Sequence, residues 1–309
     1  MILNTGSRTD IPAFYSEWFY KRIQEGNVCV RHPFDPKRVL RYKLDPKVVD
    51  VLCFCTKDPR SMLDKLMELN AFRQFWFITI TPYGKDIEPY VPNKLEVIES
   101  VKQLASFLGK HSIALRYDPI FINEKYTVEY HLRAFEKIIS SLKDSISFCV
   151  ISFIDLYKKT KKNFPQVKEV PIETQCFLAE KFNVMAKKYG ISIRSCCENE
   201  MLANYGIETS GCMNQSVLEH ALGMNLEIPK SKKSPRSKCN CLLGSDIGSY
   251  NSCLHGCIYC YANHDRRLVE YNVRRHDVSS PLLIGNIEEG DHIVDMKQES
   301  FLAKQLSLF

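Results

Sequence analysis

The stretch FWFITITPY, residues 75–83, shows the pattern that decides the fold. Its first part, Phe75–Thr81, carries no charge, and a loop, Thr81-Pro82-Tyr83, follows at once. A strand that is apolar along its whole length is typical of a parallel sheet whose two faces are covered by helices. Six similar runs are predicted as strands, at Ile2–Thr5, Val28–Arg31, Val49–Cys55, Ser112–Tyr117, Ile146–Ile154 and Ile191–Cys197.

Segments with helical periodicity separate these strands. They lie at Pro12–Gln24, Arg60–Leu69, Lys94–Lys110, Tyr126–Leu142 and Ile172–Lys188. Strands that alternate with helices predict an α/β fold with a parallel sheet. Seven such units, with an eighth strand expected near Cys241–Ile247, favour a (β/α) barrel of the TIM type, complete or partial, over an open doubly wound sheet.

Composition and charge limit the compartment and the class of protein. The 309 residues carry a net charge of +6, which permits an acidic partner without requiring one. We expect a cytoplasmic protein without a membrane segment, because there is no secretory signal and no apolar run long enough to span a bilayer. Thiols stay reduced in that compartment, so the 13 cysteines are interpreted as metal ligands or core residues rather than as a disulfide framework.

Four regions are expected along the chain. Residues 1–228 form the barrel region, and 229–238, PKSKKSPRSK, form a basic linker without an apolar side chain. Residues 239–290 form a cysteine-rich segment, and 291–309 form a tail or a helix.

Charged side chains stand at the ends of several predicted strands. In a barrel the loops that follow the strands build the functional site. Arg8, Asp10, Arg116 and Asp118 are therefore the candidate catalytic residues; the alternative is that each only caps a helix or solvates a loop.

The spacing Cys253-x3-Cys257-x2-Cys260 is the most specific signal in the sequence. Three thiolates on one tight loop can hold three irons of a [4Fe–4S] cluster, and the fourth iron then stays open to a small chelating molecule. A zinc site is the alternative, but zinc sites usually pair two C-x2-4-C knuckles, and Cys239-x-Cys241 is a poor knuckle.

This spacing, with Tyr259 just before the last cysteine, resembles the signature of the radical S-adenosylmethionine superfamily. The resemblance implies that the open iron binds S-adenosylmethionine. It also implies that one electron, from a donor such as flavodoxin or ferredoxin, yields a 5′-deoxyadenosyl radical that abstracts hydrogen. The stretch Tyr250–Ala262 is similar to the cluster loop of spore photoproduct lyase and its relatives. In that group the loop follows the first barrel strand, so its late position here resembles a circular permutation.

The chain as a whole resembles the uncharacterised bacterial family called domain of unknown function 1848 (DUF1848). The matching stretches are SRTDIPAFYSEWF, FCTKDP, RYDPI and DIGSYNSCLHGCIYCYAN. This resemblance implies a C-terminal cysteine cluster and no known reaction.

Four further cysteines can form a second site. Cys196 (or its neighbour Cys197), Cys212, Cys239 and Cys241 would suit an auxiliary iron–sulfur cluster or a structural zinc ion. The alternative is that Cys196 packs as a small apolar residue and Cys212 is incidental. Core positions are predicted for Cys29, Cys53, Cys149 and Cys176.

The chain ends in a pentapeptide similar to the peptide by which bacterial proteins dock on the DNA sliding clamp. Leu306, Leu308 and Phe309 would enter an apolar groove, and Gln305 would bind backbone groups. The alternative is the end of a helix spanning Gln298–Phe309.

Two functions follow from these observations. The first is a radical S-adenosylmethionine-like iron–sulfur enzyme, with nucleic acid or a nucleotide-like molecule as the candidate substrate because of the basic stretches 230–238 and 266–275. The second is a non-catalytic iron–sulfur or zinc protein, a redox sensor or structural protein, recruited to DNA through the clamp-like tail.

Overall fold

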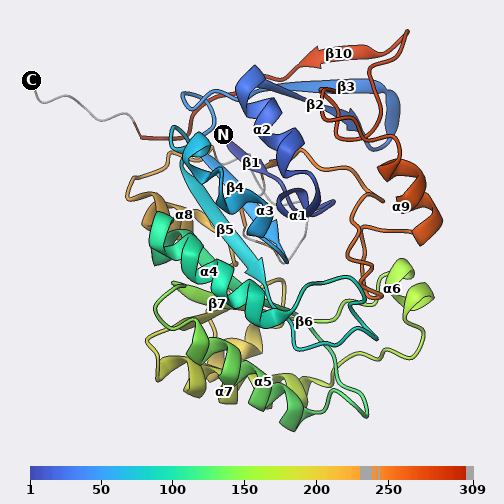
Figure 1. Ribbon diagram of the computed structural model, residues 1–309. Helices are drawn as coiled ribbons and strands as arrows, with labels where there is room; N and C mark the ends of the chain where they lie inside the picture. Colours follow the sequence, from blue (N-terminus) through green and yellow to red (C-terminus); the bar gives the residue numbers. More distant parts are fainter. Residues whose placement is uncertain (230–238, 240, 243, 304–309) are drawn as a thin grey trace, which may run out of the picture.

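Seven parallel strands form the central sheet of the computed structural model, which describes residues 1–229, 239, 241, 242 and 244–303 (Figure 1). The strands are β1 (Ile2–Asn4), β4 (Val51–Thr56), β5 (Gln74–Thr79), β6 (Ile113–Ile120), β7 (Phe148–Phe153), β8 (Ser192–Ser195) and β9 (Ser245–Asp246). Their order is β8-β7-β6-β5-β4-β1-β9. From β1 to β8, each strand of this sheet therefore lies beside the next one in the sequence, whereas β9 joins the free edge of β1. The predicted α/β class with a parallel sheet is confirmed.

The helices connect and cover these strands. They are α1 (Ile11–Phe14), α2 (Ser16–Glu25), α3 (Arg60–Leu63), α4 (Lys94–Leu108), α5 (Val128–Ser141), α6 (Lys158–Asn163), α7 (Ile172–Lys187), α8 (Gln215–Leu222) and α9 (Arg266–Val273). Short 3-10 helices are η1 (Leu66–Leu69), η2 (Lys110–Ser112) and η3 (Glu200–Tyr205). Among the described helices, none is both long enough and apolar enough to cross a membrane.

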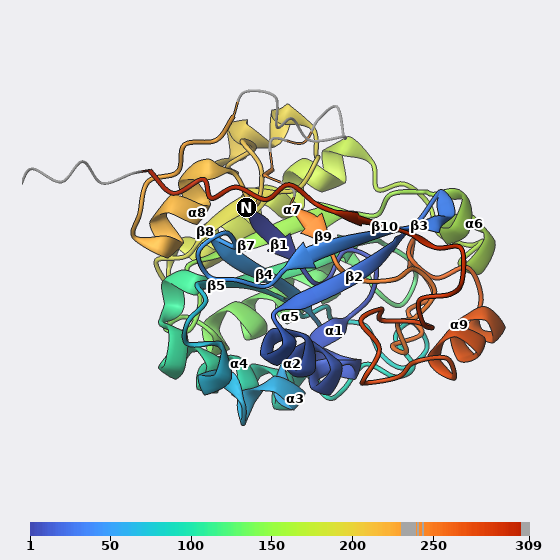
Figure 2. The same ribbon diagram turned by 90° about the horizontal axis from the view of Figure 1, so that it is seen from above.

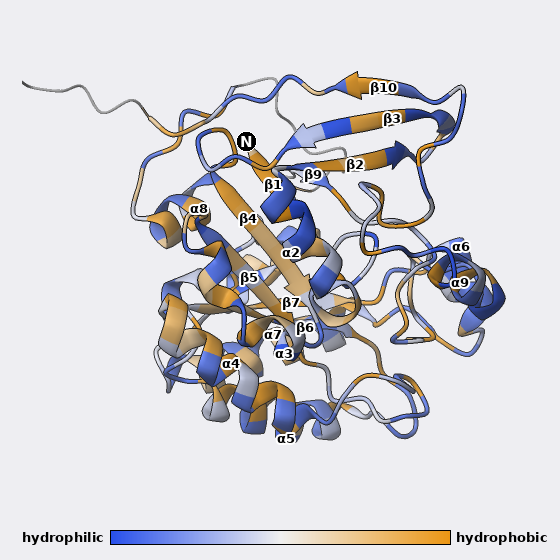
Figure 3. Cartoon of the chain, turned by 45° about the horizontal axis from the view of Figure 1, so that its top comes forward, coloured by the Kyte–Doolittle hydropathy of each residue, from blue (hydrophilic) through white to orange (hydrophobic). Residues whose placement is uncertain are grey.

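The core lies between the sheet and its helices, because the strands are apolar on both faces. Every residue of β7 is buried, and so are Val51–Phe54 of β4. Figure 3 shows β4 as a continuous hydrophobic strand inside the molecule, whereas α5 alternates between hydrophobic and hydrophilic faces. Phe54 stacks on Trp76 of the neighbouring strand at 4.1 Å between ring centroids. Apolar contacts of this kind across neighbouring strands stabilise the sheet.

The prediction that Val28–Arg31 belongs to the central sheet is wrong. This segment lies in β2 (Asn27–His32), which pairs antiparallel with β3 (Asp35–Lys43) in a separate sheet. Only two residues separate the strands, and a parallel pair would need a crossover of a dozen or more. The third strand is β10 (His292–Asp295), parallel to β3, so residues near the C-terminus lie beside residues near the N-terminus (Figure 2).

A closed barrel is not confirmed. The eighth strand expected at Cys241–Ile247 is present only as the two-residue β9. Strands β8 and β9 form the two edges of the sheet, and no ladder joins them among the described residues.

The predicted helix Pro12–Gln24 is interrupted at Tyr15, which separates α1 from α2. Tyr15 leaves the helical conformation with φ of −135°, and its hydroxyl donates a hydrogen bond to the Ser252 carbonyl at 2.6 Å. A contact with a residue more than two hundred positions away therefore accompanies the break.

The last described residues are extended, so the helix alternative for Gln298–Phe309 is wrong over 298–303. The Ser300 hydroxyl and the backbone N–H of Phe301 both donate to the Asp50 carboxylate, at 2.5 and 2.8 Å. These contacts hold the segment against Asp50 in an extended conformation. Gln305, Leu306, Leu308 and Phe309 lie outside the described residues, as do residues 230–238 of the linker.

Candidate functional site

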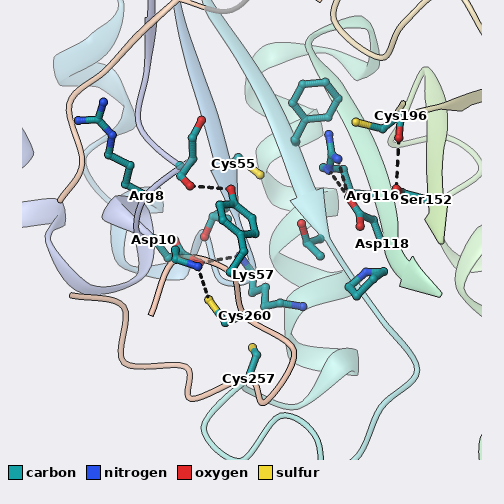
Figure 4. A pocket seen from close by; sticks show the side chains of 18 of the residues that line it. Arg8, Asp10, Cys55, Lys57, Arg116, Asp118, Ser152, Cys196, Cys257 and Cys260 are labelled. Atoms are coloured by element: carbon teal, nitrogen blue, oxygen red, sulfur yellow. Dashed lines mark hydrogen bonds and ion pairs between the residues drawn. The ribbon is translucent and has the colours of Figure 1, made fainter. Parts of the chain in front are cut away.

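A cavity of about 450 Å³ lies where the central strands end. The structure brings to it all the residues that the sequence singled out as catalytic, cofactor-binding or metal-binding: Arg8, Asp10, Arg116, Asp118, Tyr259, Cys253, Cys257, Cys260, Cys196, Cys212, Cys239 and Cys241. In Figure 4, Cys257 and Cys260 lie on one side of the cavity and Arg116, Asp118 and Cys196 on the other. The pairing of β9 with β1 explains this convergence, because the loop after β9 lies beside the loop after β1.

Residues 249–263 form what we call the cluster loop. Its three cysteines are partly exposed and line the cavity. Gly256, between the first two cysteines, has φ of +69°, and a Cβ there would lie 2.9 Å from a ring carbon of Tyr90. Only glycine fits this turn without strain. The backbone N–H of Ala262 donates to the Cys260 sulfur at 3.3 Å and so orients this thiol.

Asp10 joins the cluster loop to two strand ends. Its Oδ1 accepts the N–H of Ala13 at 3.1 Å and so caps α1. Its Oδ2 accepts the N–H of Lys57 and the Nε2–H of His255, both at 2.8 Å. Both oxygens are thus occupied by protein donors. The contacts assign Asp10 the role of holding His255, and with it the cluster loop, against the loops that follow β1 and β4.

Further hydrogen bonds fix the cluster loop along its length. The Tyr261 hydroxyl donates to the Ser7 carbonyl at 2.6 Å, and the Asn263 amide donates to the Cys253 carbonyl at 2.8 Å. The N–H of Ile258 donates to the Ile87 carbonyl at 3.1 Å. The positions of the three thiols are therefore determined by the surrounding fold and not by the loop alone.

A buried carboxylate, Glu88, binds the other side of the loop, although nothing in the sequence pointed to it. Glu88 accepts hydrogen bonds from Lys57 at 2.8 Å, from Thr81 at 2.6 Å, and from Lys94 and Tyr259. Burial alone would raise the pKa of Glu88, but the two lysines outweigh it and lower the pKa to about 2. Glu88 lies in an irregular segment nine residues beyond β5, where neither periodicity nor a strand end marks it.

Arg116 and Asp118 form an ion pair at the end of β6. The Arg116 Nη2 lies 2.5 Å from Asp118 Oδ2, and its Nη1 lies 3.6 Å from the Cys212 sulfur. Burial raises the pKa of Asp118, although Arg116 acts in the opposite direction. Arg8 instead lies 3.8 Å from Asp246 and 5.5 Å above the ring of Tyr250, so it lines the opening of the cavity.

The second thiol group consists of Cys196, Cys212, Cys239 and Cys241. The sulfurs of Cys212 and Cys241 are 3.3 Å apart, and the N–H of Cys241 donates to the Cys239 sulfur at 3.4 Å. Cys196 also contacts Cys212. Contacts with Cys212 and Cys239 lower the pKa of the Cys241 thiol to about 3, whereas contacts with Cys196 and Cys241 raise the pKa of Cys212.

Neither cysteine group is arranged around a single point. In the described part of the chain, no three Cys, His, Asp or Glu side chains stand as they would around one metal ion. A single metal ion at either group would therefore require rotation of thiol side chains. Of the cysteines predicted to be core residues, Cys29, Cys53, Cys149 and Cys176 are all buried, in agreement with the prediction.

A carboxyl group with a raised pKa stands near the second thiol group. Burial raises the pKa of Glu198 to about 7, although Ser152 and the N–H of Phe153 donate to it at 2.7 and 2.9 Å. Glu198 follows Cys196 and Cys197 in the loop after β8. Its place at a strand end was visible in the sequence, but its burial was not.

Three tyrosines surround the opening of the cavity. Tyr157, Tyr250 and Tyr261 line the cavity, yet each exposes between 39% and 42% of its surface. Helix α6 follows Tyr157 and carries exposed Lys158, Lys161 and Lys162. Its Lys159 ammonium lies 5.5 Å above the ring of Tyr250. Aromatic and basic groups are thus interleaved at this opening.

Comparison with known families assigns the chain. A model of the family described as "Domain of unknown function (DUF1848)" matches residues 2–262. The chain belongs to this family. The DUF1848 match runs from β1 through the cluster loop to Ala262, so it includes every residue that lines the cavity. No curated protein and no solved structure gave a significant match.

The lowered pKa of the buried Glu88 predicts how the free energy of unfolding depends on pH. Its folded-state pKa of about 2 lies below the ordinary value of 4.5, so its contribution is present above about pH 5 and is lost as the pH falls towards 2. We expect Glu88→Gln to lower the free energy of unfolding by about 3 kcal/mol at pH 7, and this difference from wild type to shrink as the pH falls. Urea denaturation of both proteins at pH 7, 5, 4 and 3 measures this difference in the free energy of unfolding.

The exposed Glu96, which pairs with Arg60, supplies the matched control. Glu96→Gln should change the free energy of unfolding by less than about 0.5 kcal/mol at every pH. A Glu88→Gln deficit that stays constant from pH 7 to pH 3 would contradict the charge-based account.

Proposed function

We propose that the protein is an iron–sulfur enzyme of the radical S-adenosylmethionine type. One observation carries the proposal: the thiols of Cys253, Cys257 and Cys260, on one fixed loop, all line a cavity at the strand ends that also holds charged side chains. A site for electron transfer alone would not need a cavity of about 450 Å³ beside the thiols.

The donor set of the cluster loop fits a [4Fe–4S] cluster. Three thiols are the ligands that such a cluster requires, and they leave one iron open. His255, the other ligand type on the loop, is directed to Asp10 at 2.8 Å and is not needed as a ligand. When bound, the cluster would supply one electron to S-adenosylmethionine, whose cleavage provides the radical chemistry.

The remaining groups of the cavity would bind and orient the reactants. Arg116 and Asp118 place a cation and an anion side by side, which suits a zwitterionic amino-acid group. The N–H of Lys57 is fixed by Asp10 and its ammonium by Glu88, so the strand end beside the cluster loop is rigid. The sequential strand order supports a partial (β/α) barrel that opens between β8 and β9, with this cavity at its mouth.

The alternative is a non-catalytic iron–sulfur or zinc protein that reaches DNA through a sliding clamp bound to Gln305–Phe309. It differs from the enzyme in one measurable property, because a sensor or structural protein would bind metal without cleaving S-adenosylmethionine.

The decisive experiment is an anaerobic cleavage assay. Protein reconstituted with iron and sulfide, then incubated with S-adenosylmethionine and dithionite, should release 5′-deoxyadenosine, measured by chromatography and mass spectrometry. In the variant with Cys253, Cys257 and Cys260 all replaced by alanine, the release of 5′-deoxyadenosine should be at least about 100-fold lower, because no iron would remain open to the substrate.

Cys176→Ala serves as the control, since Cys176 is buried in α7 away from the cavity. It should cleave S-adenosylmethionine at the wild-type rate. Stoichiometric zinc with no 5′-deoxyadenosine from wild type would refute the enzyme and favour the alternative.

We also propose that the substrate is nucleic acid or a nucleotide-like molecule. The interleaved tyrosines and lysines around the cavity support this, because bases stack on exposed aromatic rings and lysines attract phosphates. Among the described residues, no salt bridge engages Lys158, Lys161 or Lys162. Helix α9, with Arg266 and Arg267, stands beside α6 and extends the basic surface (Figure 1).

A charge-reversal variant tests this substrate class. Lys158→Glu combined with Lys161→Glu and Lys162→Glu should weaken the binding of a fluorescein-labelled single-stranded oligonucleotide by at least about tenfold at 0.1 M salt, measured by fluorescence anisotropy. Exposed lysines of α5, of the turn after α5 and of α7 offer a control with the same charge change: the variant that combines Lys137→Glu, Lys143→Glu and Lys187→Glu should bind as wild type does. Equal loss in both variants would show that binding follows net charge and not this surface.

A further inference from the structure

We propose that the second thiol group, Cys196, Cys212, Cys239 and Cys241, binds a second thiolate-ligated metal centre, either an iron–sulfur cluster or a zinc ion. This inference does not depend on the proposed function, because it concerns four cysteines outside the cluster loop. It is carried by their contacts, by the charges beside them and by their place in the fold.

The four thiols form an unbroken series of contacts. Cys196 contacts Cys212, the sulfurs of Cys212 and Cys241 are 3.3 Å apart, and Cys241 contacts Cys239. Sulfur ligands around a tetrahedral zinc ion lie about 3.8 Å apart, since each Zn–S bond is about 2.3 Å. A shift of the Cys212 and Cys241 sulfurs by a few tenths of an ångström would therefore reach a ligand spacing, and rotation of the outer two thiols would complete the set.

Two guanidinium groups lie beside these thiols. The Nη1 of Arg116 is 3.6 Å from the Cys212 sulfur, and Arg194 donates to the carbonyl of Gly211, the residue before Cys212, at 3.1 Å. Four thiolates around a divalent ion carry a net charge of −2, which is costly to bury without neighbouring cations. The arginines provide that compensation.

The position of the second thiol group in the fold would allow a metal centre to stabilise the central sheet. Strands β8 and β9 are the two edges of the central sheet. Cys196 directly follows β8, and Cys239 and Cys241 precede β9. No ladder joins these edges among the described residues, but the N–H of Leu242 donates to the Met213 carbonyl at 2.8 Å. A metal held by thiolates from both segments would link the edges of the sheet where backbone pairing does not.

Buried cysteines elsewhere in the chain show a different arrangement. Cys149 lies within β7, fully buried in the apolar core, and its thiol donates only to the Val150 carbonyl, at 3.7 Å. The sulfurs of the second thiol group contact one another and border the cavity. Thiols that contact one another at the border of a cavity differ in this from Cys149, which fills space in the core.

Metal and sulfide content of anaerobically reconstituted protein tests the proposal. With the cluster loop also loaded, wild type should hold two centres, which means about eight irons per chain, or about four irons and one zinc ion. The variant that lacks Cys253, Cys257 and Cys260 should keep one of them. Combining Cys212→Ser with Cys241→Ser should remove one centre and leave the cluster loop loaded, while Cys176→Ala should keep both.

Elemental analysis separates the two kinds of centre, because only a cluster adds labile sulfide together with iron. A second readout needs no variant: in native loaded protein, Cys212 and Cys241 should resist alkylation by iodoacetamide until a chelator is added, as read from peptide masses. Metal content that stays at the wild-type level when Cys212→Ser is combined with Cys241→Ser, or Cys212 and Cys241 alkylated equally before and after chelation, would overturn the proposal.

Discussion

The carboxylate of Asp10 is the contact on which the arrangement of the site depends. Through Ala13, Lys57 and His255 it joins the start of α1, the end of β4 and the cluster loop, which comes 245 residues later in the sequence than Asp10 itself. A buried carboxylate is costly unless its oxygens receive donors, so the three donors and the carboxylate hold one another in place. Asp10 shares this role with Ser7, Ile87 and Glu88, which also bind the cluster loop, but it alone of these four contacts both other segments.

The topology makes that contact available. Parallel strands place all their carboxyl ends at one side of the sheet, so loops from distant parts of the sequence meet there. Here β9 pairs with the free edge of β1, and the loop that follows it arrives beside Ser7–Asp10. A cysteine motif near the end of the chain can therefore occupy the place that the first loop would offer. Glu88, held by Lys57 and Lys94, fixes the opposite side of the loop through Tyr259.

Much of this could be predicted from residues that act locally. The uncharged run Phe75–Thr81 and its counterparts indicated parallel strands, and polar residues at their ends indicated where Arg116 and Asp118 would lie. The misassignment of Val28–Arg31 has a different origin: its partner is β3, whose other edge pairs with β10 near the opposite end of the sequence, and an apolar run does not reveal which strand it pairs with. Two other features also depend on residues that are distant in the sequence. The role of Glu88 depends on the Tyr259 side chain, and the helix break at Tyr15 is accompanied by a bond to the Ser252 carbonyl.

We propose that the cluster loop presents an iron to which S-adenosylmethionine binds. Electron paramagnetic resonance of the dithionite-reduced protein tests this most directly, with spectra recorded before and after addition of S-adenosylmethionine. We expect the signal of a reduced [4Fe–4S] cluster whose g values shift when S-adenosylmethionine is added, and no such shift in the variant without Cys253, Cys257 and Cys260. A cluster signal that S-adenosylmethionine leaves unchanged, or one that survives those three substitutions with its shift intact, would contradict it.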